Sequence, residues 1–474
     1  LNVLFSPHRT GNSISRIILW QEPKGMAIGL QNYEFGKESD LDGMPLTDRI
    51  SEFVDQLPHE LTAVLNKISL ANGGAWLVGG AVRDAALGIY PNDIDIATDL
   101  EPARLLTLFP NAIATGIAFG TITIRSGQYQ FQTTTLRSEE NYLDNRRPDS
   151  VNWETSLKSD LERRDFTINA MAIDVARRML YDPHNGLTDL DNKIIRCVGI
   201  PMQRISEDAL RMLRAYRFLG HRGNRVWQLE SQLKIAIKNN SFLMKDLARE
   251  RIWQELKKIL SSSVACEIVD QMLENDILDH IFDCKIDNKS QLRNALSDCK
   301  LLDYISLLVV ILNNSPNKEI IQICQSLKLP NKDLRIIRKM LDYQGRLPSI
   351  EKSELRLFRH LLSERCEQQL QYELIIRKNL LANFGDIDYF QIISIIEEIQ
   401  KLKPLKKDHQ IIDGHWLMAA TNLPKGERLG RLKEWLYRLQ IEHDLSTIYE
   451  VNELLCKIQW LDEDFHLWPK LSMV

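Results

Sequence analysis

The pattern of hydrophobic and polar positions changes once along the chain, near Ser206. Before that point, residues 46–72 carry apolar positions at helical spacing, and residues 74–200 alternate short strands with helices. After it, apolar residues recur almost wholly at helical spacing. The pattern therefore predicts an α+β protein with a head of mixed sheet and helices, followed by an all-α remainder. Expected strands lie at 120–125, 129–135, 172–175 and 194–198, with a hairpin turn at Gly127 joining the first two.

The same pattern divides the chain of 474 residues into segments. Residues 1–45 lack clear periodicity and start with Leu, so we expect an extension there, disordered or non-native, with Met26 or Met44 as the native start. The other expected segments are a head at 46–200, a helical neck at 201–275, a helical body at 276–400 and a helical tail at 401–474.

The densest candidate chemistry begins in the stretch LVGGAVRDAALGIYPNDIDIAT, residues 77–98. An apolar strand runs into Gly79 and Gly80, which permit a sharp turn and the close approach of a ligand. The residues after them have helical character, so free N–H groups at a helix start face the turn. Because such a helix start favours negative charge, and Arg83 adds a fixed positive one, this turn is a candidate phosphate cradle.

Two carboxylates follow in the same stretch. Asp93 and Asp95 flank Ile94 on an expected strand, so they share one face. Like charges this close require a cation between them, and hard oxygen ligands favour Mg²⁺. A lone Gly-Gly is usually only a turn and a lone Asp-x-Asp usually a solvated strand end. Together, in this order, they predict nucleotidyl transfer.

This stretch resembles the nucleotide-binding motif of the DNA polymerase beta superfamily, in particular that of the class II tRNA nucleotidyltransferases and bacterial poly(A) polymerases. A second stretch, LERRDFTINAMA at residues 161–172, contains the complete RRDFTxNA motif of the class II family. The resemblance assigns Arg164 to the nucleotide, with Asp165 and Asn169 in secondary roles. From the residues alone, the same stretch is equally a helix start with an ordinary salt bridge, on which Asp165 and Asn169 would share a face.

A third stretch, SEDALRMLRAYRF at residues 206–218, predicts a helix capped by its first residue. Asp208, Arg211, Arg214 and Arg217 recur every three residues and form a charged stripe. Three arginines against one acid favour an anionic partner over a merely solvated face.

In the family that the chain resembles, the EDxxR motif of this stretch is a protein template for the incoming base. The resemblance implies that Asp208 accepts from the exocyclic amino group of cytosine or adenine, while Arg211 donates to the adjacent ring nitrogen or carbonyl. Uracil and guanine would place an acceptor against Asp208 and be rejected. The implied nucleotide-binding residues are Gly80, Arg83, Arg164, Asp208, Arg211, Arg214 and Arg217, with secondary contributions from Gly79, Asp165, Asn169 and Glu207.

Two further stretches match family motifs with structural roles. In YDPHNGLTDL, residues 181–190, we expect Asp182, Gly186 and Asp189 to shape a supporting turn. In LARERIWQELKKIL, residues 247–260, acidic and basic side chains are expected to brace the neck helices; they are Glu250, Arg251 and Glu255.

One position departs from the superfamily pattern. Many members hold a third carboxylate on a strand beside the first two, and the strand at residues 129–134 offers none. Gln132 can orient water but cannot balance the charge of a second metal, so the number of metal ions is left open.

Two stretches bear on the branch of the family. TGIAFGTITI, residues 115–124, resembles the tRNA enzymes and lacks the arginine-rich segment expected of poly(A) polymerases. The polar loop at 136–151 has the full length expected for CCA or A addition, not CC addition. The resemblance thus implies transfer of CMP, CMP and AMP from CTP and ATP to a tRNA 3′ end, releasing pyrophosphate. The alternatives are A addition alone, a poly(A) polymerase, and, in another class, a non-catalytic RNA-binding protein.

Composition limits the partners. The net charge of −4 does not indicate a nucleic-acid binder, so RNA contacts must come from local basic patches, and no DNA partner is expected. The stretch at 413–431 resembles the family's tail, which meets the tRNA elbow. Basic residues in and just after this stretch form a local surface and are candidate tRNA contacts; they are Lys425, Arg428, Arg431 and Lys433.

Seven cysteines without a Cys-x-x-Cys pair indicate reduced thiols in the cytoplasm and no structural zinc. The apolar run at 304–313 is too short to span a membrane and predicts a buried helix. The oligomeric state is left open.

Overall fold

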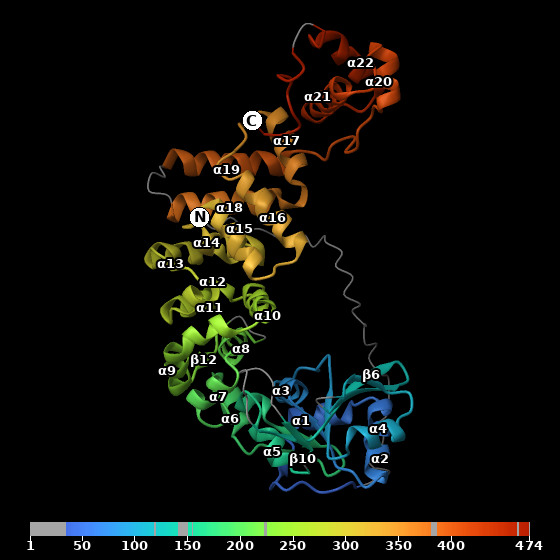
Figure 1. The fold of residues 1–474 in the computed structure, drawn as a ribbon, viewed down its shortest axis with the longest axis vertical. Coiled ribbons are helices and arrows are strands. Elements are labelled where there is room, and N and C mark those ends of the chain that lie inside the picture. The colour runs from blue at the N-terminus through green and yellow to red at the C-terminus, as the bar shows by residue number, and fades with distance from the viewer. Residues whose placement is uncertain are drawn as a thin grey trace. The chain divides into compact units, whose positions relative to one another are not determined.

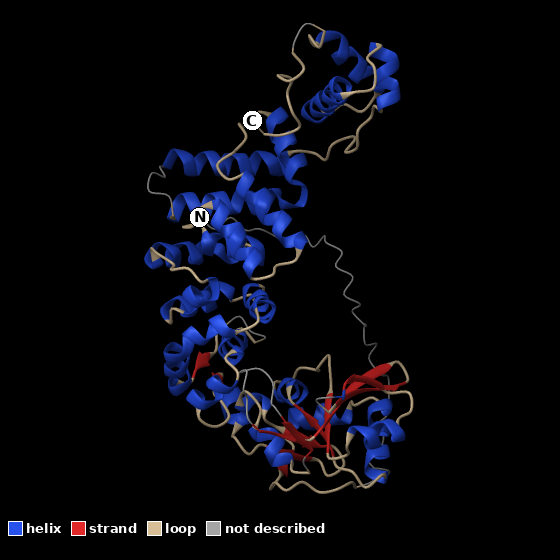
Figure 2. Ribbon diagram, in the orientation of Figure 1, coloured by secondary structure: helices blue, strands red, loops and turns tan. Residues whose placement is uncertain are grey.

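The computed structural model describes residues 35–117, 120–140, 150–153, 155–221, 225–380, 386–461 and 464–473. These residues form two compact units. The first contains the described part of Leu1–Leu136 together with Thr155–Leu157 and Ala172–Tyr181; the second contains Arg137–Glu154, Lys158–Met171 and Asp182–Val474, where described. Figure 2 shows that most strands belong to the first unit and that helices form nearly all of the second.

The first unit is built on an eight-stranded mixed sheet with the order β1-β10-β9-β2-β3-β6-β5-β4. Two of its strands, β6 and β10, are labelled in Figure 1. Among the described residues of this sheet, strands β3 and β6 run parallel to each other, and every other pair of neighbouring strands runs antiparallel. This confirms the predicted mixed sheet. The strands are β1 (Met44–Pro45), β2 (Ala75–Val78), β3 (Asp95–Thr98), β4 (Ile113–Gly116), β5 (Thr121–Ser126), β6 (Tyr129–Thr135), β9 (Ala172–Asp174) and β10 (Met179–Tyr181), and the helices are α1 (Asp48–Asp55), α2 (His59–Leu70), α3 (Gly80–Ala86) and α4 (Pro102–Leu108).

Local chemistry explains where these elements begin and end. The helical stretch expected at 46–72 is divided into α1 and α2, and Pro58 precedes the second helix in an extended conformation. Because a proline disfavours helical backbone angles in the residue before it, Pro58 separates the two helices. The hairpin between β5 and β6 turns at Gly127, whose φ is +58°, as predicted. Consecutive residues of the central strands β2 and β3 are buried, among them Leu77 and its partner Ile96, and form the core of the unit.

The segment before α1 is bound to the sheet. Met44 pairs with Leu180 of β10, and Lys37 lies 3.1 Å from the Asp99 carboxylate. A Cβ atom on Gly36 would lie 2.2 Å from the carbonyl oxygen of Gly73, so only glycine allows this close passage. Residues 35–45 of the expected extension are therefore packed against the head, while residues 1–34 of it lie outside the described residues.

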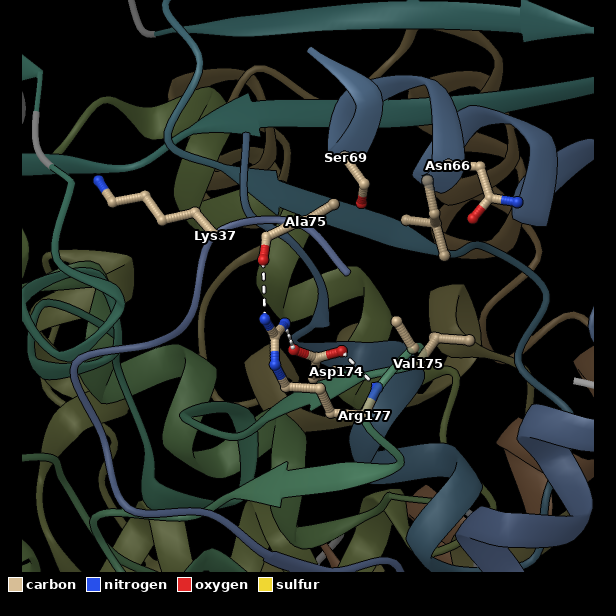
Figure 3. Close-up of a pocket in the computed structure, with 10 residues that line it drawn as sticks. Lys37, Asn66, Ser69, Ala75, Asp174, Val175 and Arg177 are labelled. Atoms are coloured by element: carbon tan, nitrogen blue, oxygen red, sulfur yellow. Dashed lines mark hydrogen bonds and ion pairs between the residues drawn. The ribbon is translucent and has the colours of Figure 1, made fainter. Parts of the chain in front are cut away.

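Arg177 anchors this segment and is one of the residues that line the pocket drawn in Figure 3. Its guanidinium donates to the Gly36 carbonyl at 2.7 Å and to the buried Asp174 carboxylate at 3.0 Å. The same guanidinium lies over the Phe35 ring, 5.4 Å from the centroid. One arginine thus neutralises a buried carboxylate and fixes the incoming chain.

The second unit begins with a small hairpin of β7 (Arg137–Glu140) and β8 (Ser150–Trp153) and then becomes helical. The expected buried helix at 304–313 is α14 (Tyr304–Leu312), whose residues from Ile305 onward are buried. The remaining elements are α5 (Leu157–Glu162), η2 (Thr167–Asn169), α6 (Gly186–Asn192), β11 (Ile194–Ile195), α7 (Pro201–Glu207), α8 (Leu210–Leu219), β12 (Gln228–Leu229), α9 (Ser231–Asn240), η3 (Ser241–Asp246), α10 (Arg249–Leu260), α11 (Ala265–Glu274), α12 (Ile277–Phe282), α13 (Lys289–Asp298), η4 (Cys299–Leu301), α15 (Asn317–Ser326), α16 (Asn331–Asp342), α17 (Lys352–Leu362), η5 (Ser363–Arg365), α18 (Cys366–Asn379), α19 (Asp386–Lys401), α20 (Gly414–Thr421), α21 (Glu427–His443) and α22 (Ile448–Lys457).

Two sequence expectations concern the chain as a whole. Each of the seven cysteines lies in a described range and is unpaired, as expected. Among the described helices, none combines the length and the apolar character needed to cross a bilayer.

Arg177→Gln is expected to lower the free energy of unfolding by about 2–3 kcal/mol, because it leaves the buried Asp174 carboxylate without its cation. The matched control is Arg178→Gln, whose partner Asp55 is exposed, with an expected cost below about 1 kcal/mol. Urea denaturation of both variants measures the difference. Equal effects would show that the Arg177 contacts do not anchor the segment.

Candidate functional site

The register of β2 and β3 brings the glycine turn to the carboxylate pair. These strands are antiparallel, and Val78 at the end of β2 pairs with Asp95 at the start of β3. Gly79 follows Val78 directly and has φ 70° and ψ −129°, a backbone conformation that only glycine adopts readily. The helix α3 begins at the next residue, Gly80, so the turn, the helix start and Asp95 share one edge of the sheet.

The structure corrects the placement of one of the two carboxylates. Asp95 is the first residue of β3, but Asp93 lies in the bend before it and is exposed. The strand is shorter than predicted. Ile94 between them is buried, which leaves the two carboxylates on the side away from the core. Among the residues that the structure describes, no group of three or more His, Cys, Asp or Glu side chains is placed to hold a metal ion.

Gln132 occupies the position next to the carboxylate pair. It is exposed on β6 and pairs with Asp95 in the parallel register of β3 and β6. Paired positions of neighbouring strands project to the same face of a sheet, so Gln132 presents an amide beside the Asp95 carboxylate. The position beside Asp95 therefore carries a neutral amide and not a third carboxylate.

Arg83 of α3 is largely buried and is held by the next residue in the chain. Its Nε and Nη2 atoms donate to Oδ1 of Asp84 at 3.0 and 2.8 Å. The sequence indicated the arginine but not its acidic partner. Two N–H groups that donate to one carboxylate oxygen fix the orientation of the guanidinium.

In the second unit, Asp160 holds Arg164 and its neighbour Arg163. Nε and Nη2 of Arg164 donate to Oδ2 of Asp160 at 3.3 and 3.0 Å, while Arg163 pairs with Oδ1. Burial alone would raise the pKa of Asp160, but the two guanidinium groups hold it below its ordinary value. Asp160 was missed from the sequence, although its spacing of four residues from Arg164 is a recognisable signal.

Asp165 makes the corresponding contact with Arg214. Nε and Nη2 of Arg214 donate to its Oδ2 atom at 2.8 and 2.5 Å, and the Asn169 amide donates to Oδ1 at 3.0 Å. Burial opposes ionisation of Asp165, but the Arg214 charge holds its pKa below the ordinary value. The expected helix through this motif is wrong. Thr167–Asn169 is a single 3₁₀ turn, and it still brings Asp165 and Asn169 together.

The expected helix that begins with Ser206 as its cap is also wrong. Ser206 lies inside α7, which starts at Pro201, a favourable first helical residue. Asp208 follows α7 in an extended conformation, and α8 then carries Arg211. The Asp208 carboxylate accepts from the Leu210 N–H at 3.1 Å, a local bond that competes with helix continuation.

Asp208 and Arg211 remain one turn apart, and the side chain of each is hydrogen-bonded to nearby residues. The Arg211 N–H donates to the Asp208 carbonyl at 3.0 Å. Nη1 of Arg211 contacts the Glu207 carboxylate at 2.9 Å and the Arg204 carbonyl at 2.6 Å, and Nη2 of Arg251 lies 3.3 Å from Asp208. Arg204 is a further residue that the sequence did not indicate; its guanidinium also donates to the Arg163 carbonyl.

Arg251 and Glu255 make the bracing contacts expected of them, and Asp182 and Asp189 make contacts that fit the expected supporting turn. Arg217 of α8 pairs with Glu255 of α10 at 3.1 Å, so that pair and Arg251–Asp208 brace the two neck helices. The Asp182 carboxylate accepts from the N–H groups of Gly186 and Leu187 and caps α6. Asp189 accepts from the Thr167 hydroxyl at 2.7 Å.

The basic residues of the tail divide into two kinds. Arg428 donates to the carbonyl oxygens of Trp460 and Leu461, and Arg431 donates to that of Trp468. These two side chains bind the C-terminal segment of the chain itself. Lys425 is exposed and Lys433 is half-buried. The predicted loop is partly seen as the β7–β8 hairpin, and residues 141–149 of it lie outside the described residues.

Comparisons with known proteins place the chain in a family. Residues 75–196 match the family described as "Poly A polymerase head domain", and residues 228–284 match "Probable RNA and SrmB- binding site of polymerase A". The chain is 31% identical over 400 residues to the CCA-adding enzyme of Lactobacillus gasseri, which spans 83% of this chain and 96% of the relative. The chain belongs to the CCA-adding enzyme family.

Other members of the CCA-adding enzyme family agree over parts of the chain or in fold. The CCA-adding enzyme of Lactiplantibacillus plantarum is 44% identical over 208 residues, 43% of this chain and half of that protein. The Bacillus stearothermophilus CCA-adding enzyme in complex with CTP has a TM-score of 0.64 at 23% identity, covering 87% of this chain and 98% of that one. The Thermotoga maritima CCA-adding enzyme complexed with tRNA has a TM-score of 0.60 at 20% identity, covering 86% of this chain and 98% of that one. These structures share the fold.

In this member of the CCA-adding enzyme family, Gln132→Glu is expected to tighten binding of a divalent cation about threefold or more, because it adds a charged oxygen ligand beside Asp95. The matched control is Gln130→Glu, two residues away on the same strand and face, for which less than about a twofold change is expected. Titration with Mn²⁺, followed by electron paramagnetic resonance, measures both. A Gln132→Glu variant that binds the ion no more tightly would show that this face does not hold it.

Proposed function

We propose that this chain adds CCA to the 3′ end of tRNA, transferring CMP, CMP and AMP from CTP and ATP without a nucleic-acid template. The observation that carries the proposal is the strand register that sets Asp95 beside the Gly79 turn. Membership of the CCA-adding enzyme family, with a relative aligned over 96% of its length, supports the same reaction. The unpaired cysteines fit action in the cytoplasm.

In the proposed reaction the terminal 3′-hydroxyl oxygen of the tRNA attacks the α-phosphorus of the nucleotide. A new P–O bond forms, the bond to the bridging oxygen of the β-phosphate breaks, pyrophosphate leaves, and the hydroxyl proton passes to solvent. Asp93 and Asp95 would hold the Mg²⁺ ion through their carboxylate oxygens, and the ion would supply Lewis-acid stabilisation of charge at the phosphate and the hydroxyl. Gly79 and Gly80 leave the backbone at this turn open to a phosphate.

The arginines that we assign to the triphosphate are already oriented. Arg164 and Arg214 each use the Nε and Nη2 edge of the guanidinium on a buried carboxylate. Since a guanidinium carries five N–H groups in a fixed plane, N–H groups remain for an anion on the Nη1 and Nη2 edge. These donors stabilise negative charge as pyrophosphate leaves. Arg83 and Arg217 are assigned to the same role.

Asp208 and Arg211 are the proposed readers of the base. Glu207 and the Arg204 carbonyl hold Arg211 by Nη1, which leaves its Nε side for a base edge. Cytosine and adenine share an amino group next to a ring acceptor, so one acceptor and one donor suit both. The choice between CCA and A addition depends on the loop at 136–151, and CCA addition is preferred because the loop has its full length.

An incorporation assay with tRNAs that differ in their 3′ end distinguishes the candidate functions. Purified protein is expected to extend tRNA lacking CCA with CTP and then ATP, to add one A to tRNA ending in CC, and to leave complete tRNA unextended. An Asp93→Asn, Asp95→Asn double variant should lose transfer by at least about 10³-fold, since the metal ligands supply several kcal/mol. Incorporation of A without C would favour the A-adding enzyme, long A tracts a poly(A) polymerase, and RNA binding without transfer the non-catalytic protein.

Arg211→Ala and Asp208→Ala are each expected to relax base choice by about 5- to 150-fold, because a good bidentate contact contributes about 1–3 kcal/mol of discrimination. UTP and GTP should gain relative to CTP and ATP in single-nucleotide incorporation assays. Asp189→Asn, which removes a buried carboxylate that contacts Thr167, serves as the control and should keep the parental ranking. If both test variants also keep the parental ranking, the pair does not read the base.

A further inference from the structure

We infer that Asp160 is a positioning residue for the nucleotide triphosphate, acting through Arg164; the inference rests on the proposed function of Arg164. Asp160 lies on α5, and its side chain is 2% exposed, so it cannot itself meet a nucleotide. Both of its oxygens are occupied by guanidinium groups, Oδ1 by Arg163 and Oδ2 by Arg164. A buried carboxylate shared by two arginines leaves each guanidinium little choice of orientation.

The pairing also determines which part of Arg164 can meet an anion. Nε and Nη2 face Asp160, and Nη1 lies 3.4 Å from the Asn169 carbonyl oxygen, so the guanidinium plane is fixed at both ends. The side chain of Arg164 is 18% exposed, and the N–H groups left over belong to its terminal nitrogens. Asp160 therefore orients the terminal edge of the Arg164 guanidinium toward a phosphate and prevents the side chain from adopting another rotamer.

The same carboxylate supports the base-reading residues through the backbone. The carbonyl oxygens of Arg163 and Arg164 accept from Nη2 of Arg204 at 2.5 and 3.1 Å, and Nη2 of Arg211 lies 3.4 Å from the first of them. Asp160 acts on the side chain of Arg164 directly and on Arg211 only through this backbone. Loss of Asp160 should thus weaken the binding of all nucleotides by the same factor, without changing the preference among bases.

The test is the dissociation constant of CTP and of ATP for the full chain, measured by calorimetry, for Asp160→Asn and for Asp174→Asn. Asp174 is the matched control because its side chain is 5% exposed and it pairs with an arginine three residues on, as Asp160 does. Asp160→Asn should weaken both nucleotides by about tenfold or more, as expected for losing an oriented charged hydrogen bond, with Asp174→Asn within about twofold of the parent. The ranking of the four nucleotides should not move.

Asp160→Asn leaves two arginines beside a neutral amide, so the Asp160→Asn, Arg163→Gln double variant is measured as well, to relieve one of the unpaired charges if the single variant does not fold. It should show the same loss of CTP and ATP affinity. Affinity within twofold of the control in either folded variant overturns the inference, as does a change in base ranking. A parent chain that binds neither nucleotide overturns the proposed function itself.

Discussion

Pairing of arginine with a carboxylate is the interaction on which the candidate site depends. Removing the partner of a buried charge costs several kcal/mol, and the arginines assigned to the nucleotide are either buried or half-buried. Each has an acidic partner: Asp84 for Arg83, Asp160 for Arg164, Glu207 for Arg211, Asp165 for Arg214 and Glu255 for Arg217. The partners make burial tolerable, and they also fix the direction in which each cation points.

This arrangement explains how an acidic chain can handle polyanionic substrates. With a net charge of −4, the chain as a whole offers no general attraction for nucleic acid. In the proposed site, oriented N–H groups of paired arginines replace bulk positive charge. Such donors need no rearrangement when an anion arrives, which is the condition under which electrostatic stabilisation contributes most to a reaction. A site of this kind depends on geometry more than on the number of cations.

The sequence predicted the mixed sheet, the helical remainder, the β5–β6 hairpin and the Gly79 turn, because each has a local signal in apolar spacing or in glycine. It did not predict the partners that lie far apart in the chain. Arg214 meets Asp165 across 49 positions, and Arg251 meets Asp208 across 43. No local pattern encodes these pairs. Asp160 and Arg164, four residues apart, could have been recognised from helical spacing alone.

The prediction of one continuous helix in place of α7 and α8 is the instructive error, because the break between them changes how base reading would work. A continuous helix would have left Asp208 and Arg211 as neighbours on a solvated stripe. Instead Asp208 has an extended backbone, and its carboxylate accepts from the Leu210 N–H and contacts Arg251. Arg211 lies one turn further on, paired with Glu207. Discrimination between bases depends on the cost of an unpaired acceptor, and that cost is realised only if the acceptor cannot turn away. The break would thus supply the rigidity that the proposed protein template requires, which a regular helix with mobile side chains would lack.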